Sequence, residues 1–188
     1  MPLAEIVKLF DVKDVNKTGA TFDIDKLSWM NGQYIKNAQP HALVSATEEF
    51  LKGKNIIDDK FDKNRWADIV KAYKERTRTL EDFSGVYKIF FNDALEYDEK
   101  AVEKYLKKPN SKDIISKCSS AVRDLSDYNK VTIEESYRKL ADELKVKAAD
   151  LIHPTRVAIS GKTVGAGLFD IMELLGREKV MERLGKFC

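Results

Sequence analysis

Cysteine, histidine and long apolar runs are scarce in this 188-residue sequence. It contains two cysteines, Cys118 and Cys188, and two histidines, His41 and His153. Two cysteines cannot form the disulfide framework of a small secreted protein, and so few candidate ligands argue against a metal site. No run of about 18 apolar residues suggests a transmembrane helix, and the first residues lack the basic start and apolar stretch of a secretory signal. We therefore expect a cytoplasmic protein with no membrane partner and no bound metal.

A strong excess of either charge is also absent. The 33 Lys and Arg residues nearly balance 31 Asp and Glu residues, which leaves a formal charge of +2. This balance argues against indiscriminate binding to nucleic acid, so any such binding must come from a local patch. Hydrophobic residues make up 43% of the sequence, which argues against wholesale disorder. The length allows one domain or two small ones, each with a buried core.

The apolar spacing is helical along most of the sequence, and almost no segment alternates as a strand does. For example, Leu3, Ile6, Val7 and Phe10 recur at steps of three and four. Near residue 97 aromatic residues become sparse and Lys and Glu begin to alternate. We therefore predict an all-α fold with two helical lobes that meet near this position. The predicted helices include residues 3–10, 62–78, 79–91, 98–107, 111–126, 132–144, 168–175 and 177–184.

Several helix starts follow from capping residues. Asp25 is expected to cap a helix that ends at the Gln39-Pro40 step, because the residue before proline avoids helical geometry. Ser45 or Thr47 is expected to open a short helix through Leu51. Thr132 and Glu135 have the spacing of a capping box. Pro154 can start a further short helix, which Gly161 would end.

The sequence shows no set of residues that could be ordered into an active site. No Ser–His–Asp pattern and no Cys–His pair occurs at a useful spacing. The Gly161-Lys162-Thr163 string lacks the preceding glycine-rich stretch and strand of a phosphate-binding loop. The Glu134/Glu135 pair has the character of an exposed helix start. A binding module is therefore favoured over an enzyme.

Two places suit binding, and each has a plainer alternative. The first is a basic stretch beside aromatic residues, where cations can hold phosphates and rings can stack on bases; it contains Lys71, Lys74, Arg76 and Arg78. Its plainer interpretation is the solvated end of a helix. The second is the 163–167 turn, whose backbone amides can meet phosphates or base edges. Its plainer interpretation is a connection between two helices.

Three segments resemble a known family, the bacterial glutamate–tRNA ligases of class I. GATFDIDKLSWMNGQYIK (Gly19–Lys36) closely resembles the segment that follows their catalytic half. YKERTRTLEDF (Tyr73–Phe83) resembles their anticodon-reading helix region, and RVAISGKTVGAGLFDIMELLGREKVMERL (Arg156–Leu184) resembles their final helices. The resemblance implies the C-terminal anticodon-binding region, a helical-bundle or cage domain. Residues 1–40 would end the stem-contact region, 41–97 would form a first anticodon-binding lobe, and 98–188 a second.

The resemblance also implies that catalysis and anticodon binding belong to different parts of the full-length ligase. The HIGH-type and KMSKS-type motifs of the family's catalytic domain do not occur here. The chain alone would therefore be no enzyme and would need no cofactor, whereas the full-length ligase uses ATP and Mg²⁺ to attach glutamate to its tRNA. This part would hold the anticodon loop of the glutamate tRNA as a monomer. Both an excised piece of such an enzyme and a separate protein are compatible with the sequence.

The family's anticodon-reading arginine matches Arg76. In the family it reads the third anticodon base, a cytosine, and a guanidinium fork can donate to cytosine O2 and N3. Glutamine at this position accompanies relaxed discrimination between glutamate and glutamine tRNAs, so Arg76 implies the discriminating type. Lys71, Lys74 and Arg78 are candidate phosphate contacts because of their charge and position.

Further matched positions lie in the last segment. A second family arginine matches Arg156, and the family's turn residues that contact the anticodon match Gly165, Ala166 and Leu168. Ala166 replaces the usual proline of that turn. Any contact at Gly165 must use backbone atoms.

Two other interpretations come from different functional classes. A helical adaptor could dock an amphipathic protein partner between the lobes without binding RNA. A free-standing enzyme of unknown chemistry is the third. RNA binding should weaken steeply with added salt, whereas apolar docking should not, so salt dependence separates the first two. The aromatic residues Trp29 and Tyr34 are expected to serve packing.

Overall fold

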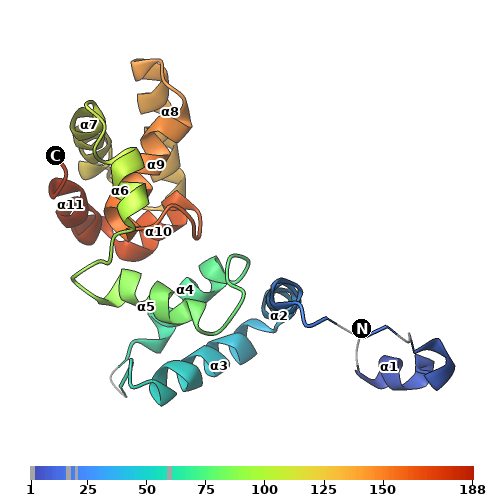
Figure 1. Cartoon of the computed structure of the whole chain (residues 1–188). Helices are drawn as coiled ribbons and strands as arrows, with labels where there is room; N and C mark the ends of the chain where they lie inside the picture. The colour runs from blue at the N-terminus through green and yellow to red at the C-terminus, as the bar shows by residue number, and fades with distance from the viewer. Residues whose placement is uncertain (1–2, 16–17, 20, 59–60) are drawn as a thin grey trace.

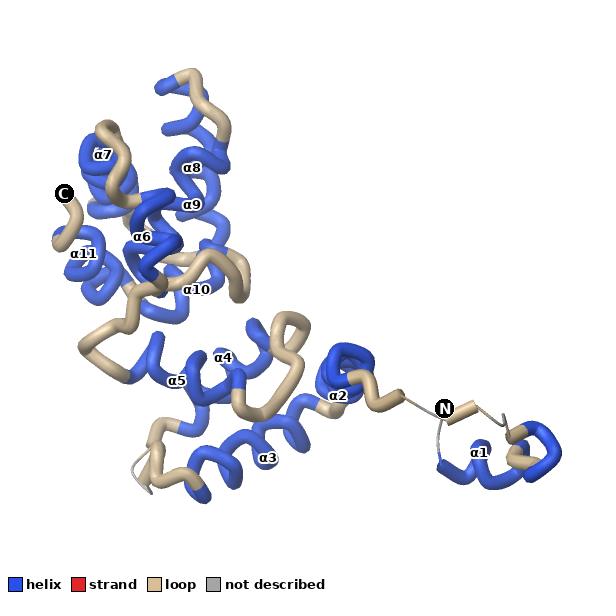
Figure 2. The backbone as a smooth tube through the Cα atoms, in the orientation of Figure 1, coloured by secondary structure: helices blue, strands red, loops and turns tan. Residues whose placement is uncertain are grey.

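The computed structural model of the chain describes residues 3–15, 18–19, 21–58 and 61–188. In these ranges every regular element is helical and no strand occurs, which confirms the predicted all-α class (Figure 2). The elements are α1 (Leu3–Leu9), the 3-10 turn η1 (Val12–Asp14), α2 (Ile24–Asn37), α3 (Pro40–Gly53), α4 (Lys63–Tyr73), α5 (Asp82–Phe91), α6 (Glu99–Tyr105), α7 (Ser111–Arg123), α8 (Lys130–Leu144), α9 (Ala148–Ser160), α10 (Leu168–Leu175) and α11 (Arg177–Gly185).

The helices gather into two groups, with the N-terminal elements to one side. Helices α6 to α11 form a bundle, α3 to α5 lie beneath it, α2 lies beyond the start of α3, and α1 is set apart (Figure 1). Helix α1 buries none of its residues. The predicted division at residues 40 and 97 stays a prediction, although α3 begins at Pro40. None of the described helices combines the length and the apolar composition that a bilayer crossing requires.

An aromatic cluster forms the core of the α3–α5 group. Trp66 is fully buried and meets Phe83 and Tyr87 edge-on, and Phe61 adds a further edge-on contact. A buried indole N–H needs an acceptor, and Trp66 Nε1 donates to Thr47 Oγ1 at 3.0 Å. The expectation that Ser45 or Thr47 opens a helix was therefore wrong. Thr47 lies inside α3, which begins at Pro40 because proline suits the first helical turn.

A buried arginine joins the two groups. Arg183 of α11 is 1% exposed and donates to the carbonyl of Ile159 at 2.6 Å, of Ile89 at 2.8 Å and of Asn92 at 3.2 Å. Ile159 belongs to α9, whereas Ile89 lies in α5 and Asn92 caps its end. The Asp98 N–H also donates to the Gly161 carbonyl at 3.0 Å. These bonds fix how the two groups face each other.

Helix α4 is shorter than the sequence predicts. It ends at Tyr73 and not at Arg78, because the Asp82 carboxylate accepts from the backbone N–H of Arg78 at 2.7 Å and of Thr79 at 2.9 Å. These bonds stabilise a turn before α5, which begins at Asp82 rather than Thr79. The basic residues that follow Tyr73 therefore lie in a connection and not on a helix face.

Helix α9 is longer than predicted and contains Pro154 in its interior. It begins at Ala148, so the expected start at Pro154 was wrong. An interior proline costs about 3 kcal/mol, but α9 buries a nearly continuous apolar stretch that includes Leu151, Val157 and Ile159. This burial offsets the cost. The predicted end at Gly161 is confirmed, since this residue caps α9 with φ +71°.

Other helix ends differ by a few residues because neighbouring side chains compete for the cap. Asp23, not Asp25, caps α2 by accepting from the Lys26 N–H at 3.0 Å. The capping box of α8 joins Thr132 to Asn129 and not to Glu135. Helix α7 ends at Arg123 instead of residue 126. The predicted helix Leu168–Leu175 is confirmed at both ends as α10.

The N-terminal region keeps large apolar side chains at its surface. Trp29 is 58% exposed and Tyr34 is 66% exposed, so the interpretation of these residues as packing residues was wrong for this chain. The side chain of Ile35 is buried instead. Helix α2 is joined to the 74–78 connection, where Asn31 Nδ2 donates to the Arg78 carbonyl.

Candidate nucleic-acid interface

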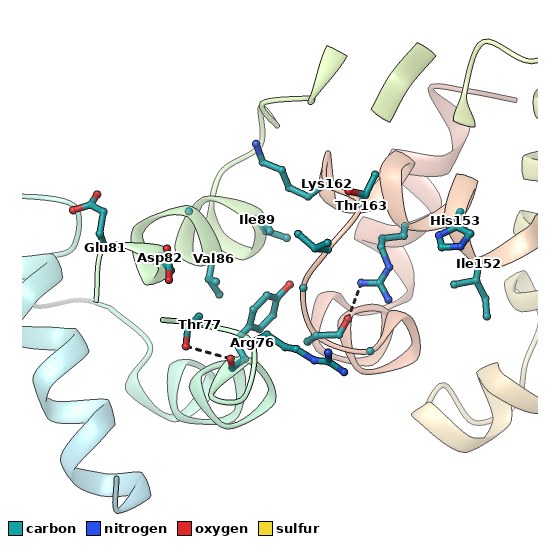
Figure 3. Close-up of a pocket in the computed structure, with 17 residues that line it drawn as sticks. Arg76, Thr77, Glu81, Asp82, Val86, Ile89, Ile152, His153, Lys162 and Thr163 are labelled. Atoms are coloured by element: carbon teal, nitrogen blue, oxygen red, sulfur yellow. Dashed lines mark hydrogen bonds between the residues drawn. The ribbon is translucent and has the colours of Figure 1, made fainter. Parts of the chain in front are cut away.

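A cleft of about 660 Å³ opens between the two helical groups (Figure 3). One side, here called the α4–α5 wall, comprises Tyr73, Arg76, Thr77, Glu81, Asp82, Gly85, Val86 and Ile89. The other side, the α9–α10 wall, comprises Ile152, His153, Arg156 and the 162–167 turn. The cleft therefore joins two segments that lie about 80 residues apart in the sequence.

Arg156 is fixed within the α9–α10 wall. Its Nη1 atom donates to the carbonyl of Ala166 at 2.7 Å, which ties α9 to the turn before α10. The side chain is half-buried, and burial is the main cause that lowers the pKa of Arg156. The positive charge of Arg76 across the cleft lowers this pKa further. Arg156 thus places a fixed positive charge beside the opening.

The turn between α9 and α10 depends on Gly165. Its φ of +148° lies in a region that residues with a side chain rarely adopt. A Cβ atom at this position would lie 3.3 Å from Cε1 of the Tyr73 ring, so the glycine also lets the turn approach the opposite wall closely. Beyond it, Ala166 is buried and Leu168 is 3% exposed.

Arg76 is free in a way that Arg156 is not. Its backbone N–H donates to the Tyr73 carbonyl at 2.8 Å, which holds the connection in place. Its guanidinium makes no hydrogen bond or ion pair with the residues that the structure describes, and it points across the cleft toward the α9–α10 wall (Figure 3). An exposed guanidinium offers five donors in a rigid fork, which suits a carbonyl, a ring nitrogen or a phosphate.

The acidic residues of the cleft are already engaged. Glu81 pairs with Lys54. The Asp82 carboxylate accepts from the backbone N–H groups of Arg78 and Thr79, in the connection between α4 and α5. The basic residues Arg76 and Lys162 are exposed. The open cleft is therefore rich in hydrogen-bond donors, which favours an anionic ligand or one that carries acceptors.

Four of the residues predicted for binding meet in this cleft: Arg76, Arg156, Gly165 and Ala166. Leu168 is buried in α10 and does not line it. The three candidate phosphate residues lie outside its lining. Of these, Lys71 is exposed on α4, and Lys74 Nζ donates to the Ala38 carbonyl at 2.6 Å. The backbone of Arg78 contributes to the cap before α5.

The sequence analysis did not predict three other residues of the cleft. Tyr73 lies in the predicted helix 62–78 and was given no binding role. Lys162 belongs to the Gly161-Lys162-Thr163 string, which does not fit a phosphate-binding loop. His153 lies within α9 and stacks on Tyr105, with the ring centroids 5.1 Å apart. Tyr73 and Lys162 both lie inside matched segments, Tyr73–Phe83 and Arg156–Leu184. This position is the signal by which the sequence could have indicated them.

The lining of the cleft suits the binding of a nucleotide. Among the residues that the structure describes, no group of three or more His, Cys, Asp or Glu side chains could hold a metal ion. The cleft instead offers two arginines, a lysine and a backbone turn around an opening large enough for a nucleotide. A splayed base of single-stranded RNA suits such an opening, because it presents its pairing edge and its phosphate together.

Comparisons with known proteins agree with this geometry. Residues 33–188 match the family described as anticodon binding domain. Over 179 residues the chain is 44% identical to glutamate–tRNA ligase 2 of Thermoanaerobacter pseudethanolicus, covering 95% of this chain and 37% of that protein. Glutamate–tRNA ligase 1 of Caldanaerobacter subterraneus subsp. tengcongensis is 40% identical, with the same two coverages. The chain thus spans 37% of the length of these curated relatives.

Solved structures give the same result for the fold. The crystal structure of a glutamate tRNA ligase from Elizabethkingia meningosepticum, in complex with its amino acid, superposes with a TM-score of 0.75 at 28% identity. It covers 97% of this chain, which corresponds to 36% of that protein. Glutamate-tRNA synthetase from Elizabethkingia anophelis superposes with a TM-score of 0.72 at 27% identity.

Proposed function

Because the chain belongs to the anticodon binding domain family, we propose that its cleft receives the anticodon loop of a glutamate tRNA. The observation that carries this proposal is the guanidinium of Arg76, which has no partner among the described residues and faces the fixed Arg156 across the cleft. The identity to glutamate–tRNA ligases along 95% of the chain supports the choice of tRNA. The chain would then be the anticodon-reading part of such a ligase.

Arg76 is proposed to read the third anticodon base. A cytosine presents two adjacent acceptors, O2 and N3, to the guanidinium fork, whereas a guanine presents N–H donors on its pairing edge. The fork can therefore bond the cytosine and leaves donors facing donors when guanine takes its place. This difference would separate glutamate tRNAs from glutamine tRNAs.

The other matched residues are proposed to position the loop. Arg156 and the backbone of Gly165 and Ala166 would contact it from the α9–α10 wall. Leu168 would contact the loop through its backbone, since its side chain is buried. Three candidate phosphate contacts lie outside the cleft: Lys71, Lys74 and Arg78. They are proposed to bind backbone phosphates of the tRNA next to the anticodon loop.

The remaining assignments belong to the same proposal. ATP and Mg²⁺ would act in the catalytic part of the ligases, so this chain would bind neither and would not attach glutamate by itself. It would work in the cytoplasm as a monomer. Residues 1–40 would adjoin the tRNA stem, and residues 41–97 and 98–188 would form the two anticodon-binding lobes.

The first test compares two RNA hairpins that differ only in the third anticodon base. We expect the chain to bind the cytosine hairpin about tenfold more tightly than the guanine hairpin, since a good bidentate contact contributes about 1–3 kcal/mol of discrimination. The Arg76→Gln variant should lose this preference. Fluorescence anisotropy titrations of labelled hairpins measure both dissociation constants.

The control variant is Arg123→Gln, which removes the same charge from an exposed position at the end of α7. It should keep the preference. If Arg76→Gln discriminates as well as the unaltered chain, Arg76 does not read the base. If affinity for either hairpin does not fall as salt is raised, the RNA-binding proposal fails and docking of a protein partner is favoured.

A further inference from the structure

Tyr73 carries a hydroxyl that none of the residues described by the structure satisfies. Its side chain is 3% exposed, and its hydroxyl has no hydrogen-bond partner among the residues that the structure describes. Buried polar groups without a partner are uncommon and cost free energy in the folded state. Tyr73 also lines the cleft. An unpaired hydroxyl in the wall of a binding cleft suggests a partner that arrives with the ligand.

The charged side chain that acts on this hydroxyl is Arg156. Its guanidinium has no acceptor and cannot receive the hydroxyl proton, and its Nη1 atom already donates to the Ala166 carbonyl. Burial raises the pKa of Tyr73, so the hydroxyl stays protonated and is available as a donor. The ring itself is fixed by an edge-on contact with Phe90, with the centroids 5.9 Å apart. The wall thus presents another donor in a set orientation.

The turn that contains Gly165 covers the Tyr73 hydroxyl. A Cβ atom at Gly165 would lie 3.5 Å from Tyr73 Oη, so the turn passes close to the hydroxyl. Gly165 has no side chain to hold it there, and the preceding residues Lys162, Thr163 and Val164 are exposed, with Val164 at 80%. Residues 162–164 bury little surface and can move at small cost, whereas Ala166 is buried and bonded to Arg156.

We propose that the Tyr73 hydroxyl donates a hydrogen bond to an acceptor oxygen of the nucleotide that enters the cleft, after this nucleotide moves the Gly165 turn aside. The acceptor is a base carbonyl oxygen or a phosphate oxygen, which share the chemistry that the hydroxyl requires. The proposal rests on the proposed function and adds to it a neutral donor beside Arg76 and Arg156. It also assigns residues 162–165 a change of position on binding, while Ala166 stays bonded to Arg156.

The Tyr73→Phe variant tests this directly, because it removes one oxygen and keeps the ring. We expect its affinity for the cytosine hairpin to fall about threefold to tenfold, as for one lost hydrogen bond. Its midpoint of urea unfolding should stay the same or rise, because the folded chain has no partner for the lost hydroxyl. A merely structural tyrosine would show the opposite pattern.

The matched control is Tyr128→Phe. The Tyr128 hydroxyl is also buried and unpartnered among the described residues, but Tyr128 does not line the cleft. Its removal should leave hairpin affinity unchanged. The proposal is overturned if Tyr73→Phe binds as tightly as the unaltered chain, or if it unfolds at lower urea.

The hairpin pair also separates the two proposals. If the unaltered chain prefers cytosine and Arg76→Gln abolishes this preference while Tyr73→Phe binds normally, only the role of Tyr73 is lost. If the unaltered chain does not bind the hairpins, both proposals fail. An equal loss for Tyr73→Phe on both hairpins supports a phosphate acceptor, and a loss confined to one hairpin supports a base carbonyl.

Discussion

The two walls of the cleft differ in how firmly they hold their arginines. In the α9–α10 wall, Arg156 is half-buried and bonded to the Ala166 carbonyl. In the α4–α5 wall, Arg76 is exposed in a connection, and its guanidinium has no partner among the described residues. A fixed group can place a ligand in the same position each time, while an unpaired group can exchange water for a base edge. The difference supports the proposal that one wall positions the anticodon loop and the other reads it.

The difference between the two walls depends on their fixed arrangement in space. The Arg183→Met variant is designed to loosen this arrangement. Methionine keeps the approximate length of the side chain but cannot donate to the carbonyls of Ile89, Asn92 and Ile159. We expect the free energy of unfolding to fall by about 3 kcal/mol, since bonds to charged groups contribute about 1.5–3 kcal/mol each and burial of the charge is relieved. Urea unfolding followed by circular dichroism measures the change.

A surface arginine provides the reference for this variant. Arg138 forms an exposed pair with Glu134 one helical turn away. Arg138→Met should cost less than about 1 kcal/mol, as exposed ion pairs do. Equal losses for the two variants would show that Arg183 does not join the helical groups as described.

The second variant, Gly165→Ala, alters the α9–α10 wall where it approaches Tyr73 of the other wall. Its φ of +148° disfavours a side chain, and the added Cβ would lie 3.3 Å from the Tyr73 ring. We expect a loss of about 2 kcal/mol in the free energy of unfolding, within the range for strained backbone positions. Gly185→Ala, where an added Cβ meets nothing within 4 Å, should be neutral or stabilising. Similar thermal unfolding midpoints for both variants would contradict the role given to Gly165.

The smallest expected effect on stability comes from Arg156→Met, and it sharpens the contrast between the walls. Loss of the bond to Ala166 should lower the free energy of unfolding by about 1 kcal/mol. Affinity should fall to the same extent for the cytosine and guanine hairpins, because Arg156 is proposed to position the loop and not to read the base. A loss confined to one hairpin, measured by the same anisotropy titration, would make Arg156 a second reader.

Much of the fold follows from local patterns that the sequence contains. The helix Leu168–Leu175 lies between Gly167 and Gly176, and both ends were predicted correctly. Predictions were less accurate where a distant side chain decides the outcome. The role of Thr47 depends on the Trp66 indole, 19 residues away. The start of α9 depends on burial among other helices, which outweighs the preference of Pro154 for a first turn.

The residues of the candidate site also differ in how far the sequence alone could predict them. Charge indicated the stretch around Arg76 and backbone amides indicated the 163–167 turn, but Arg156 and the individual roles of Arg76, Gly165 and Ala166 came from the family resemblance. That they face one cleft depends on Arg183, whose bonding partners lie up to 94 residues away in the sequence. The unpaired Tyr73 hydroxyl could not be predicted at all, because the absence of a partner is a property of the packed chain.

The environments of the two tryptophans have a consequence for spectroscopy. Trp66 lies fully inside the α3–α5 group, whereas Trp29 on α2 is 58% exposed. Buried and hydrated indoles emit at different wavelengths, and only the hydrated one meets a dissolved quencher. The intrinsic fluorescence of the chain therefore has two components, and a quencher separates the signal of the N-terminal region from that of the helical body without any added label.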